Sequence, residues 1–432
     1  MSGVTKIEWT NATWNPVRGC AIVSKGCTNC YAMRLAHRFA GAGKPFEGLT
    51  KLAKGGPVWT GKVRLVPELL DWPLRRLKPS RIFVNSMSDL FHEDVPDEFI
   101  DRVFAVLASS SKHTFQVLTK RADRMQQYMQ RIADGAPMAG QRYEAAMREH
   151  FDRYKLDFRE GYSLPAPPTP ELRFLYDSAV VQEHRPTAPC GTTLAYGFSG
   201  GEYHWRAWPL NNVWLGVSVE DQAAADERIP LLLNTPAAVR WISAEPLVGP
   251  VSLGKWLPPG RANWQCMKCA GFCGGGFQVS CPHCGADKSY LCGSHVANKP
   301  RPDTFTGSTN HQPIDWVVAG GESGPGARPM HPDWPRSLRN QCAAAGVPYF
   351  FKQWGAWSPV GPIYYDEDTA EHLAALDCDD DTARECFVTR SGLRWLCDRD
   401  GQPPLGTWAM ERIGKRAAGR LLDGRMHNEY PT

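Results

Sequence analysis

The chain has 432 residues, of which 42% are hydrophobic and 22% are charged. This composition excludes an intrinsically disordered chain, and the length allows two or three domains or one large barrel with insertions. The 49 Lys and Arg against 45 Asp and Glu give a net charge of +4, which excludes a histone-like polycation but allows a local basic groove. The 14 Cys are the most informative count, because they are spread unevenly.

The sequence contains no apolar run of 18 or more residues, and its first residues lack the apolar segment of a signal peptide. We therefore expect a cytoplasmic protein without membrane contact, and a monomer. Thiols stay reduced in that compartment, so the many Cys favour metal ligation over disulfides.

Six short apolar runs each lead into a polar loop, and several are separated by stretches with helical spacing. The helical stretches are Asp97–Ser110, Gln222–Leu233 and Trp334–Ala345. Alternation of strand, polar loop and helix predicts the α/β class, as a partial or full (β/α) barrel or a parallel sheet. The six expected strands cover residues 81–84, 113–118, 213–219, 239–242, 316–319 and 348–351.

Polar residues follow these expected strands, where a barrel carries its reactive groups. Any one of them is equally well explained as the N-cap of the next helix, but the set is not. We expect the set to converge on one mouth of the barrel: Asp89, Lys120, Glu220, Glu245, Glu322 and Lys352.

Two stretches interrupt the strand and helix pattern. Residues 124–209 begin as a polar helix and continue without periodicity, which predicts a helical lid. Residues 257–313 hold six Cys and predict a zinc-ribbon-like insertion. The barrel then comprises 1–123, 210–256 and 314–355, and 356–432 form a C-terminal extension that ends in a basic helix, Glu411–Arg425.

Three N-terminal cysteines, Cys20, Cys27 and Cys30, have C-x6-C-x2-C spacing. Three thiolates on one loop leave the fourth position of a metal centre open, as catalytic centres do. A [4Fe–4S] cluster fits this set, since Cys thiolates are the usual cluster ligands. The alternative is a zinc site completed by a distant Cys or His.

These cysteines, followed by strand–helix units, resemble the radical S-adenosylmethionine superfamily, whose usual first gap is shorter. The match is closer to a phage and prophage family often called three-Cys-motif proteins, whose relatives are similar to spore photoproduct lyases, which repair DNA. The similar segments are Thr10–Pro16, Gly26–Tyr31, Asn85–Phe91, Leu118–Arg121, Gly216–Glu220, Glu245–Leu247, Gly320–Gly324, Phe351–Gly355 and Gly414–Arg420.

The resemblance implies that Cys20, Cys27 and Cys30 hold the cluster, and that S-adenosylmethionine chelates its open iron. Reductive cleavage then gives a 5′-deoxyadenosyl radical that abstracts a hydrogen from the substrate, with flavodoxin or ferredoxin as electron donor. Lys120 and Lys352 neutralise an anionic group, and Glu322 borders the adenosine or the substrate. The expected cofactor-binding residues are Tyr31, Asn85, Ser86, Ser88, Asp89, Ser218, Glu220 and Glu245.

Cys266, Cys269, Cys281 and Cys284 form a CxxC…CxxC pair with eleven residues between the halves. Two such turns give the closed four-thiolate geometry of a structural Zn²⁺ site. This ribbon either grips nucleic acid or a partner, or staples an insertion that has little core of its own.

The C-terminal segment places Arg412, Lys415, Arg416 and Arg420 on about one face of the expected helix, an array that suits phosphate contacts. With the resemblance, it favours a nucleic-acid substrate, DNA rather than RNA, for lesion repair or base modification. A solvated helix face explains the cations alone. Two other functions stay open: a radical enzyme acting on a small molecule or peptide, and a non-enzymatic metal-stabilised nucleic-acid-binding module.

Overall fold

A computed structural model describes residues 2–133, 209–258, 313–363, 385–392 and 406–431, together with short strands at 197–199, 202–204, 264–266, 272–273, 291–292 and 394–395. The chain divides into two compact units. The first comprises Met1–Ser24, Cys30–Val217 and Asn234–Arg240, and the second comprises Lys25–Asn29, Ser218–Leu233 and Trp241–Thr432. The short segment Lys25–Asn29 therefore belongs to the second unit.

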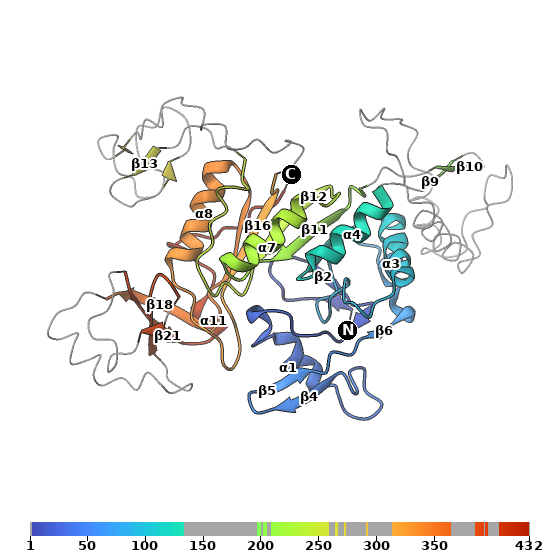
Figure 1. Ribbon diagram of the computed structural model, residues 1–432, viewed down its shortest axis with the longest axis horizontal. Helices are drawn as coiled ribbons and strands as arrows, with labels where there is room; N and C mark the ends of the chain where they lie inside the picture. The colour runs from blue at the N-terminus through green and yellow to red at the C-terminus, as the bar shows by residue number, and fades with distance from the viewer. Residues whose placement is uncertain are drawn as a thin grey trace. The chain divides into compact units, whose positions relative to one another are not determined.

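The first unit begins with short strands around α1 and then alternates strands and helices from β7 to α4 (Figure 1). Its elements are β1 (Gly3–Val4), β2 (Ala12–Trp14), β3 (Val17–Arg18), α1 (Tyr31–His37), β4 (Thr50–Ala53), β5 (Gly56–Trp59), β6 (Arg64–Leu65), η2 (Pro67–Leu69), α2 (Trp72–Arg75), β7 (Arg81–Val84), α3 (Asp97–Ser109), β8 (Thr114–Thr119), α4 (Ala122–Ala133), β9 (Gly197–Ser199), β10 (Glu202–His204) and β11 (Val213–Ser218).

Parallel pairing organises the main sheet of the first unit. β2 pairs with β7, β7 with β8, and β8 with β11, all in parallel, while β1 adds an antiparallel edge. β7, β8 and β11 are mostly buried, as expected of parallel strands that helices cover. α3 and α4 lie side by side (Figure 1), and Tyr128 of α4 donates a hydrogen bond to Asp101 of α3 over 2.8 Å.

The second unit repeats the pattern. Parallel pairs join β12 to β16 and β16 to β17, and an antiparallel sheet with the order β18-β21-β19-β20 follows. Its elements are η1 (Lys25–Cys27), α7 (Gln222–Leu233), β12 (Val239–Ala244, which begins in the first unit), β13 (Trp264–Cys266), β14 (Phe272–Cys273), β15 (Leu291–Cys292), β16 (Trp316–Gly320), α8 (Asp333–Ala345), β17 (Tyr349–Gln353), β18 (Trp357–Pro362), β19 (Glu385–Val388), β20 (Arg394–Trp395), β21 (Trp408–Arg412) and α11 (Lys415–Ala418).

Aromatic side chains fill the core of each unit. In the first, Trp14 lies 6.1 Å from Phe115 between ring centroids. In the second, Trp316 lies 5.4 Å from Trp241 and 5.3 Å from Tyr430, and its indole N–H donates to the Glu429 carbonyl. The C-terminal residues are therefore built into the core of the second unit.

The predicted α/β class is confirmed, and the parallel β–α repeats of the two units are compatible with a partial barrel. All six predicted strands and all three predicted helices occur at the expected places. Among the described residues, no helix is both long and apolar enough to cross a membrane.

The predicted basic helix Glu411–Arg425 is wrong. Residues through Arg412 belong to β21, and α11 covers only Lys415–Ala418. Gly414 and Gly419 stand at its two ends with φ of 85° and 72°. These conformations suit glycine and not a continuing helix, so the cations of this segment do not share one helical face.

Candidate functional site

The three N-terminal cysteines occupy a short stretch of loop and its borders. Cys20 follows β3, Cys27 ends η1, and Cys30 immediately precedes α1. Cys27 is buried, Cys20 and Cys30 are partly exposed, and none of the three forms a disulfide. Within the described residues, no group of three or more His, Cys, Asp or Glu side chains is assembled as a metal site. The three thiols could serve as metal ligands, but in this structure they are not arranged around one common point.

Gly19, the residue before Cys20, lies against the loop that follows β7. It forms a parallel bridge with Ser88, whose hydroxyl donates to the Val17 carbonyl over 2.8 Å. Gly19 has φ of 87°, and a Cβ there would lie 2.3 Å from the Lys62 carbonyl oxygen. Only glycine fits this close approach.

The loop after β7 carries an unusual asparagine. Asn85 has φ of 60° and is buried. Its side-chain oxygen accepts from the Val17 N–H over 3.3 Å, while its Nδ2 is buried with no hydrogen-bonding partner among the described residues. A left-handed non-glycine residue with an unsatisfied donor is the kind of local strain that accompanies binding sites.

Neighbouring side chains fix the same loop. The buried Asn15 accepts hydrogen bonds from the Ser86 hydroxyl over 3.2 Å and the Met87 N–H over 3.0 Å. The Tyr31 hydroxyl donates to the Ser86 carbonyl over 2.8 Å. Tyr31, Ser86 and Ser88, all expected cofactor residues, therefore shape this loop through hydrogen bonds of their own.

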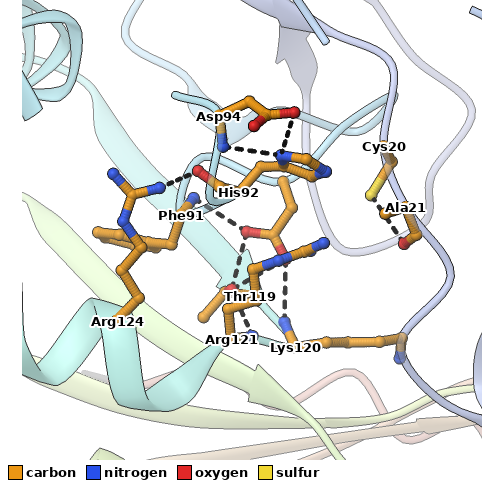
Figure 2. Close-up of polar contacts among 10 residues, drawn as sticks. Cys20, Ala21, Phe91, His92, Asp94, Thr119, Lys120, Arg121 and Arg124 are labelled. Atoms are coloured by element: carbon orange, nitrogen blue, oxygen red, sulfur yellow. Dashed lines mark hydrogen bonds and ion pairs between the residues drawn. The ribbon is translucent and has the colours of Figure 1, made fainter. Parts of the chain in front are cut away.

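Asp89 is the centre of a buried polar network, part of which Figure 2 shows. Its carboxylate accepts from the Thr119 hydroxyl at 2.8 and 2.9 Å, from the Lys120 N–H at 3.2 Å and from the Arg121 guanidinium at 3.2 Å. The Phe91 N–H adds a further bond of 3.0 Å. Asp89 and Lys120 are thus brought together as expected, but through the Lys120 backbone.

Arg121 connects this network to a cysteine. Burial disfavours the charged guanidinium, yet the Asp89 carboxylate and a hydrogen bond with Cys20 raise the pKa of Arg121 above its ordinary value. The Cys20 sulfur itself lies 3.5 Å from the Ala21 carbonyl oxygen, to which the thiol donates.

His92 lies beside this network and is fully buried. Its Nδ1 accepts from the Asp94 N–H over 3.2 Å, so Nε2 carries the proton, and Nε2 has no partner among the described residues. Burial, and then the nearby Arg121 charge, lower the pKa of His92. Arg124 donates to the His92 carbonyl and fixes the backbone here (Figure 2).

In the second unit, Glu245 and Lys352 form a close ion pair. The Lys352 Nζ lies 2.5 Å from the Glu245 Oε1, and both side chains are largely buried. Both were expected at strand ends facing a common site, and the structure brings them together. Lys352 is thus already neutralised.

Glu322 lies in a second polar cluster of this unit. Its carboxylate accepts from the Asn29 side chain at 3.0 Å and from three nitrogens of Arg328 at 2.7–3.0 Å. The preceding Gly321 packs directly on the backbone, since a Cβ there would lie 2.0 Å from the Trp354 carbonyl oxygen.

Ser218 and Glu220, two further expected cofactor residues, are tied to α7. Arg228 donates to the Glu220 carboxylate over 2.9 Å and to the Ser218 carbonyl over 2.8 Å. Both charged side chains are buried. This pair joins the end of β11 to the helix that follows it, a contact that serves the fold.

The expected nucleic-acid residues separate into two groups. Lys415 and Arg416 are exposed on α11. Arg420 instead donates to the Lys352 carbonyl and to Asn428, and Arg412 stacks 5.9 Å above the Trp357 ring.

The expected zinc ligands Cys269, Cys281 and Cys284 lie outside the described residues, and Cys266 is described only as part of β13. β13 pairs antiparallel with β14 and β15, so this insertion contains a small antiparallel sheet.

Sequence reasoning missed Arg121, Asn15, Asn29 and Arg328. Arg121 had a usable signal, because it directly follows Lys120 in the polar loop after β8. Arg328 had none, because its role depends on Asn29 and Glu322, which are far from each other in the sequence.

A family model described as a protein of unknown function, DUF5131, matches residues 4–431. This match covers nearly the whole chain, and its description states no activity. No curated protein and no solved structure matches the chain.

Proposed function

This chain belongs to the DUF5131 family, and we propose that it is a radical S-adenosylmethionine enzyme whose substrate is a nucleic acid. Cys20, Cys27 and Cys30 hold the [4Fe–4S] cluster in this proposal. When bound, the cluster supplies the electron that cleaves S-adenosylmethionine to a 5′-deoxyadenosyl radical, which abstracts a hydrogen from the substrate.

The contact between Cys20 and Arg121 carries the proposal. Cys thiolates are the usual ligands of iron–sulfur clusters, and all three thiols are outside disulfides. Arg121 pairs with the Asp89 carboxylate over 3.2 Å, and its interactions with Asp89 and Cys20 raise the pKa of the Arg121 guanidinium. A buried cation beside a cysteine is more than a packing cysteine needs, and it suits a ligand that must bind as thiolate.

The loop after β7 is the proposed cofactor-binding element. The buried Nδ2 of Asn85 requires an acceptor, and the carboxylate of an amino-acid cofactor offers one. Asn15 and Tyr31 hold the loop in its shape, so this donor is fixed before a ligand arrives. Ser88 and Asp89 act in the same element by anchoring it to β3 and to the loop after β8.

In the second unit, Glu245 and Lys352 are the residues proposed to meet an anionic group. Because Lys352 is neutralised by Glu245, an anionic group binds it only by competing with this carboxylate. The pair therefore exchanges partners when such a group arrives, and Lys352 donates to it.

The nucleic-acid part of the proposal is supported by the exposed Lys415 and Arg416 and by the family resemblance, with DNA favoured over RNA. A base would have to leave its stack to reach a buried site. The same proposal includes a structural Zn²⁺ site that stabilises the insertion, with the ligands Cys266, Cys269, Cys281 and Cys284.

The test is anaerobic reconstitution followed by an assay for 5′-deoxyadenosine. The wild type is expected to bind iron and sulfide and to cleave S-adenosylmethionine under reducing conditions. The triple variant Cys20→Ala/Cys27→Ala/Cys30→Ala should do neither, whereas Cys386→Ala, which alters a buried cysteine of β19, should do both. Full cluster content in the triple variant would refute the assignment.

Substrate arms of the same assay separate the remaining possibilities. Lesion-containing DNA should accelerate cofactor cleavage, and tRNA should do so less. Acceleration by cell metabolites or peptides alone would replace the nucleic-acid substrate with a small one. Nucleic-acid binding without any cofactor cleavage would indicate a binding module.

A further inference from the structure

The carboxylate of Glu322 has little capacity left for a substrate. Its Oε2 accepts from Asn29 Nδ2 at 3.0 Å, from the Arg328 N–H at 2.8 Å and from Arg328 Nε at 3.0 Å. Its Oε1 accepts from Arg328 Nη2 at 2.7 Å. The Glu322 side chain is 4% exposed. These four hydrogen bonds hold the buried Glu322 carboxylate in one position.

Both partners of Glu322 reach the segment that holds the second cysteine. Asn29 is itself the last residue of that segment, between Cys27 and Cys30 in the sequence, and its Nδ2 also donates to the Gly326 carbonyl at 2.6 Å. Arg328 donates from Nη2 to the Lys25 carbonyl at 3.0 Å. The two ends of Lys25–Asn29 are thus held by one carboxylate–guanidinium pair.

The anchor itself stands on rigid backbone. A Cβ at Gly355 would lie 2.1 Å from the Glu322 carbonyl oxygen, and that oxygen accepts from the Ala356 N–H at 2.8 Å. Gly321 packs equally close to Trp354. Glu322 is therefore positioned by main-chain contacts that leave it little freedom to move.

From this geometry we infer that Glu322 and Arg328 are positioning residues, which hold Lys25–Asn29 in the form that presents Cys27 for metal binding. In this inference Glu322, which follows Gly320 and Gly321, serves the cysteine loop and does not touch the substrate. The holding function stands on the contacts alone, whereas its purpose in metal binding rests on the proposed function. Pre-organising a ligand loop in this way lowers the cost of assembling a metal site.

The first measurement is hydrogen exchange of the metal-free, full-length chain over the segment Lys25–Asn29, where the Thr28 N–H donates to the Lys25 carbonyl. Glu322→Gln should raise exchange there about tenfold, because charge-assisted hydrogen bonds are lost. Asn29→Ala removes one bridge and leaves the Glu322–Arg328 pair intact, so it should raise exchange about threefold. It also carries the test if Glu322→Gln does not fold.

The matched control is Glu220→Gln, which neutralises another buried carboxylate paired with an arginine in the same unit. It should leave exchange over Lys25–Asn29 at the wild-type rate. Unchanged exchange in both Glu322→Gln and Asn29→Ala would overturn the inference, as would equal acceleration in the Glu220→Gln control.

The second measurement is iron and sulfide per chain after anaerobic reconstitution. Glu322→Gln should bind severalfold less than the Glu220→Gln control. A variant that keeps wild-type exchange and cluster content but loses cofactor cleavage would overturn the positioning role in favour of a catalytic one. If the wild type itself binds no cluster, the proposed function fails, and the exchange data still decide whether the loop is held.

Discussion

Two buried pairs of this protein each join an arginine to an acid that follows a strand, and they differ in what surrounds them. Asp89 follows β7 and pairs with Arg121, and Glu220 follows β11 and pairs with Arg228. Arg228 also donates a hydrogen bond to the Ser218 carbonyl, within the same strand–helix connection. Arg121 instead interacts electrostatically with Cys20, which contributes to its raised pKa.

This difference between Arg121 and Arg228 shows that an acid after a strand can mark where a site lies. It does not indicate which groups the site binds. Glu220 closes a local connection, and the hydrogen bonds of Arg228 go to Ser218 and Glu220 within it. Asp89 pairs with an arginine whose pKa is also affected by Cys20, a residue outside the connection between β7 and β8. In the proposed function, the second partner of the arginine distinguishes the two pairs.

The largest effect is expected from breaking the structural pair. Arg228→Met leaves the Glu220 carboxylate buried without its cation and should lower the free energy of unfolding by about 3–5 kcal/mol. The double variant Glu220→Gln/Arg228→Met removes both charges and should regain more than half of that loss. Denaturant unfolding of the metal-free chain measures both; equal loss in single and double variants would mean that packing, and not charge, stabilises this connection.

A buried histidine without an acidic partner extends the comparison, because burial is the largest cause of its pKa shift, ahead of the nearby charges of Lys112 and Arg76. Burial lowers the pKa of His113 to about 4, although its Nε2 donates to the carbonyls of Pro73 and Arg76. The unfolded chain keeps an ordinary histidine pKa near 6.5, so it binds the proton first as the pH falls. Stability should therefore decline from pH 6.5 toward pH 4, by about 2–3 kcal/mol from this residue.

Urea unfolding at pH 7 and pH 4.5 measures this contribution. His113→Gln should show a smaller loss of stability between the two pH values than the wild type. His37→Gln, which alters a half-buried histidine bonded to Thr50, should keep the wild-type loss. A wild-type slope in His113→Gln would assign the acid sensitivity to other groups.

The smallest effect concerns the pair that faces Cys20. The double variant Asp89→Asn/Arg121→Gln removes both charges and leaves no uncompensated carboxylate. Loss of the nearer cation should shift the reduction potential of the proposed cluster by about 60 mV to more negative values, a tenfold change for one electron. Potentiometric titration followed by electron paramagnetic resonance measures it. Glu220→Gln/Arg228→Met is the control. Equal reduction potentials in the two variants would show that Arg121 does not influence the cluster.

Local patterns in the sequence predicted the α/β framework well. The runs at 81–84 and 316–319 became β7 and β16, because β-branched and aromatic residues in short apolar runs suit buried parallel strands. The C-terminal region was mispredicted for an equally physical reason. Cations at helical spacing between Arg412 and Arg425 suggested a helix, but Gly414 and Gly419 adopt positive φ and limit it to four residues.

The candidate site could be predicted only in part. Cys20, Cys27 and Cys30 are neighbours in the chain, so their spacing carries the signal. The contact between Arg121 and Asp89 spans 32 residues, and that between Asn29 and Glu322 spans 293. No local periodicity encodes such contacts. Glu322 therefore looked like a residue for the adenosine or the substrate, whereas its hydrogen bonds connect it to the cysteine loop.

The close approach of Gly321 to Trp354, and of Gly355 to Glu322, has a consequence for how this family varies. A side chain at either glycine would force two backbone segments apart. We therefore expect both positions to stay glycine in related sequences, whether or not the protein still performs its reaction. A descendant that had lost its cysteines would be expected to keep both glycines. Their presence in a relative would therefore indicate a shared fold, whereas the proposed chemistry would be indicated by the cysteines and Arg121.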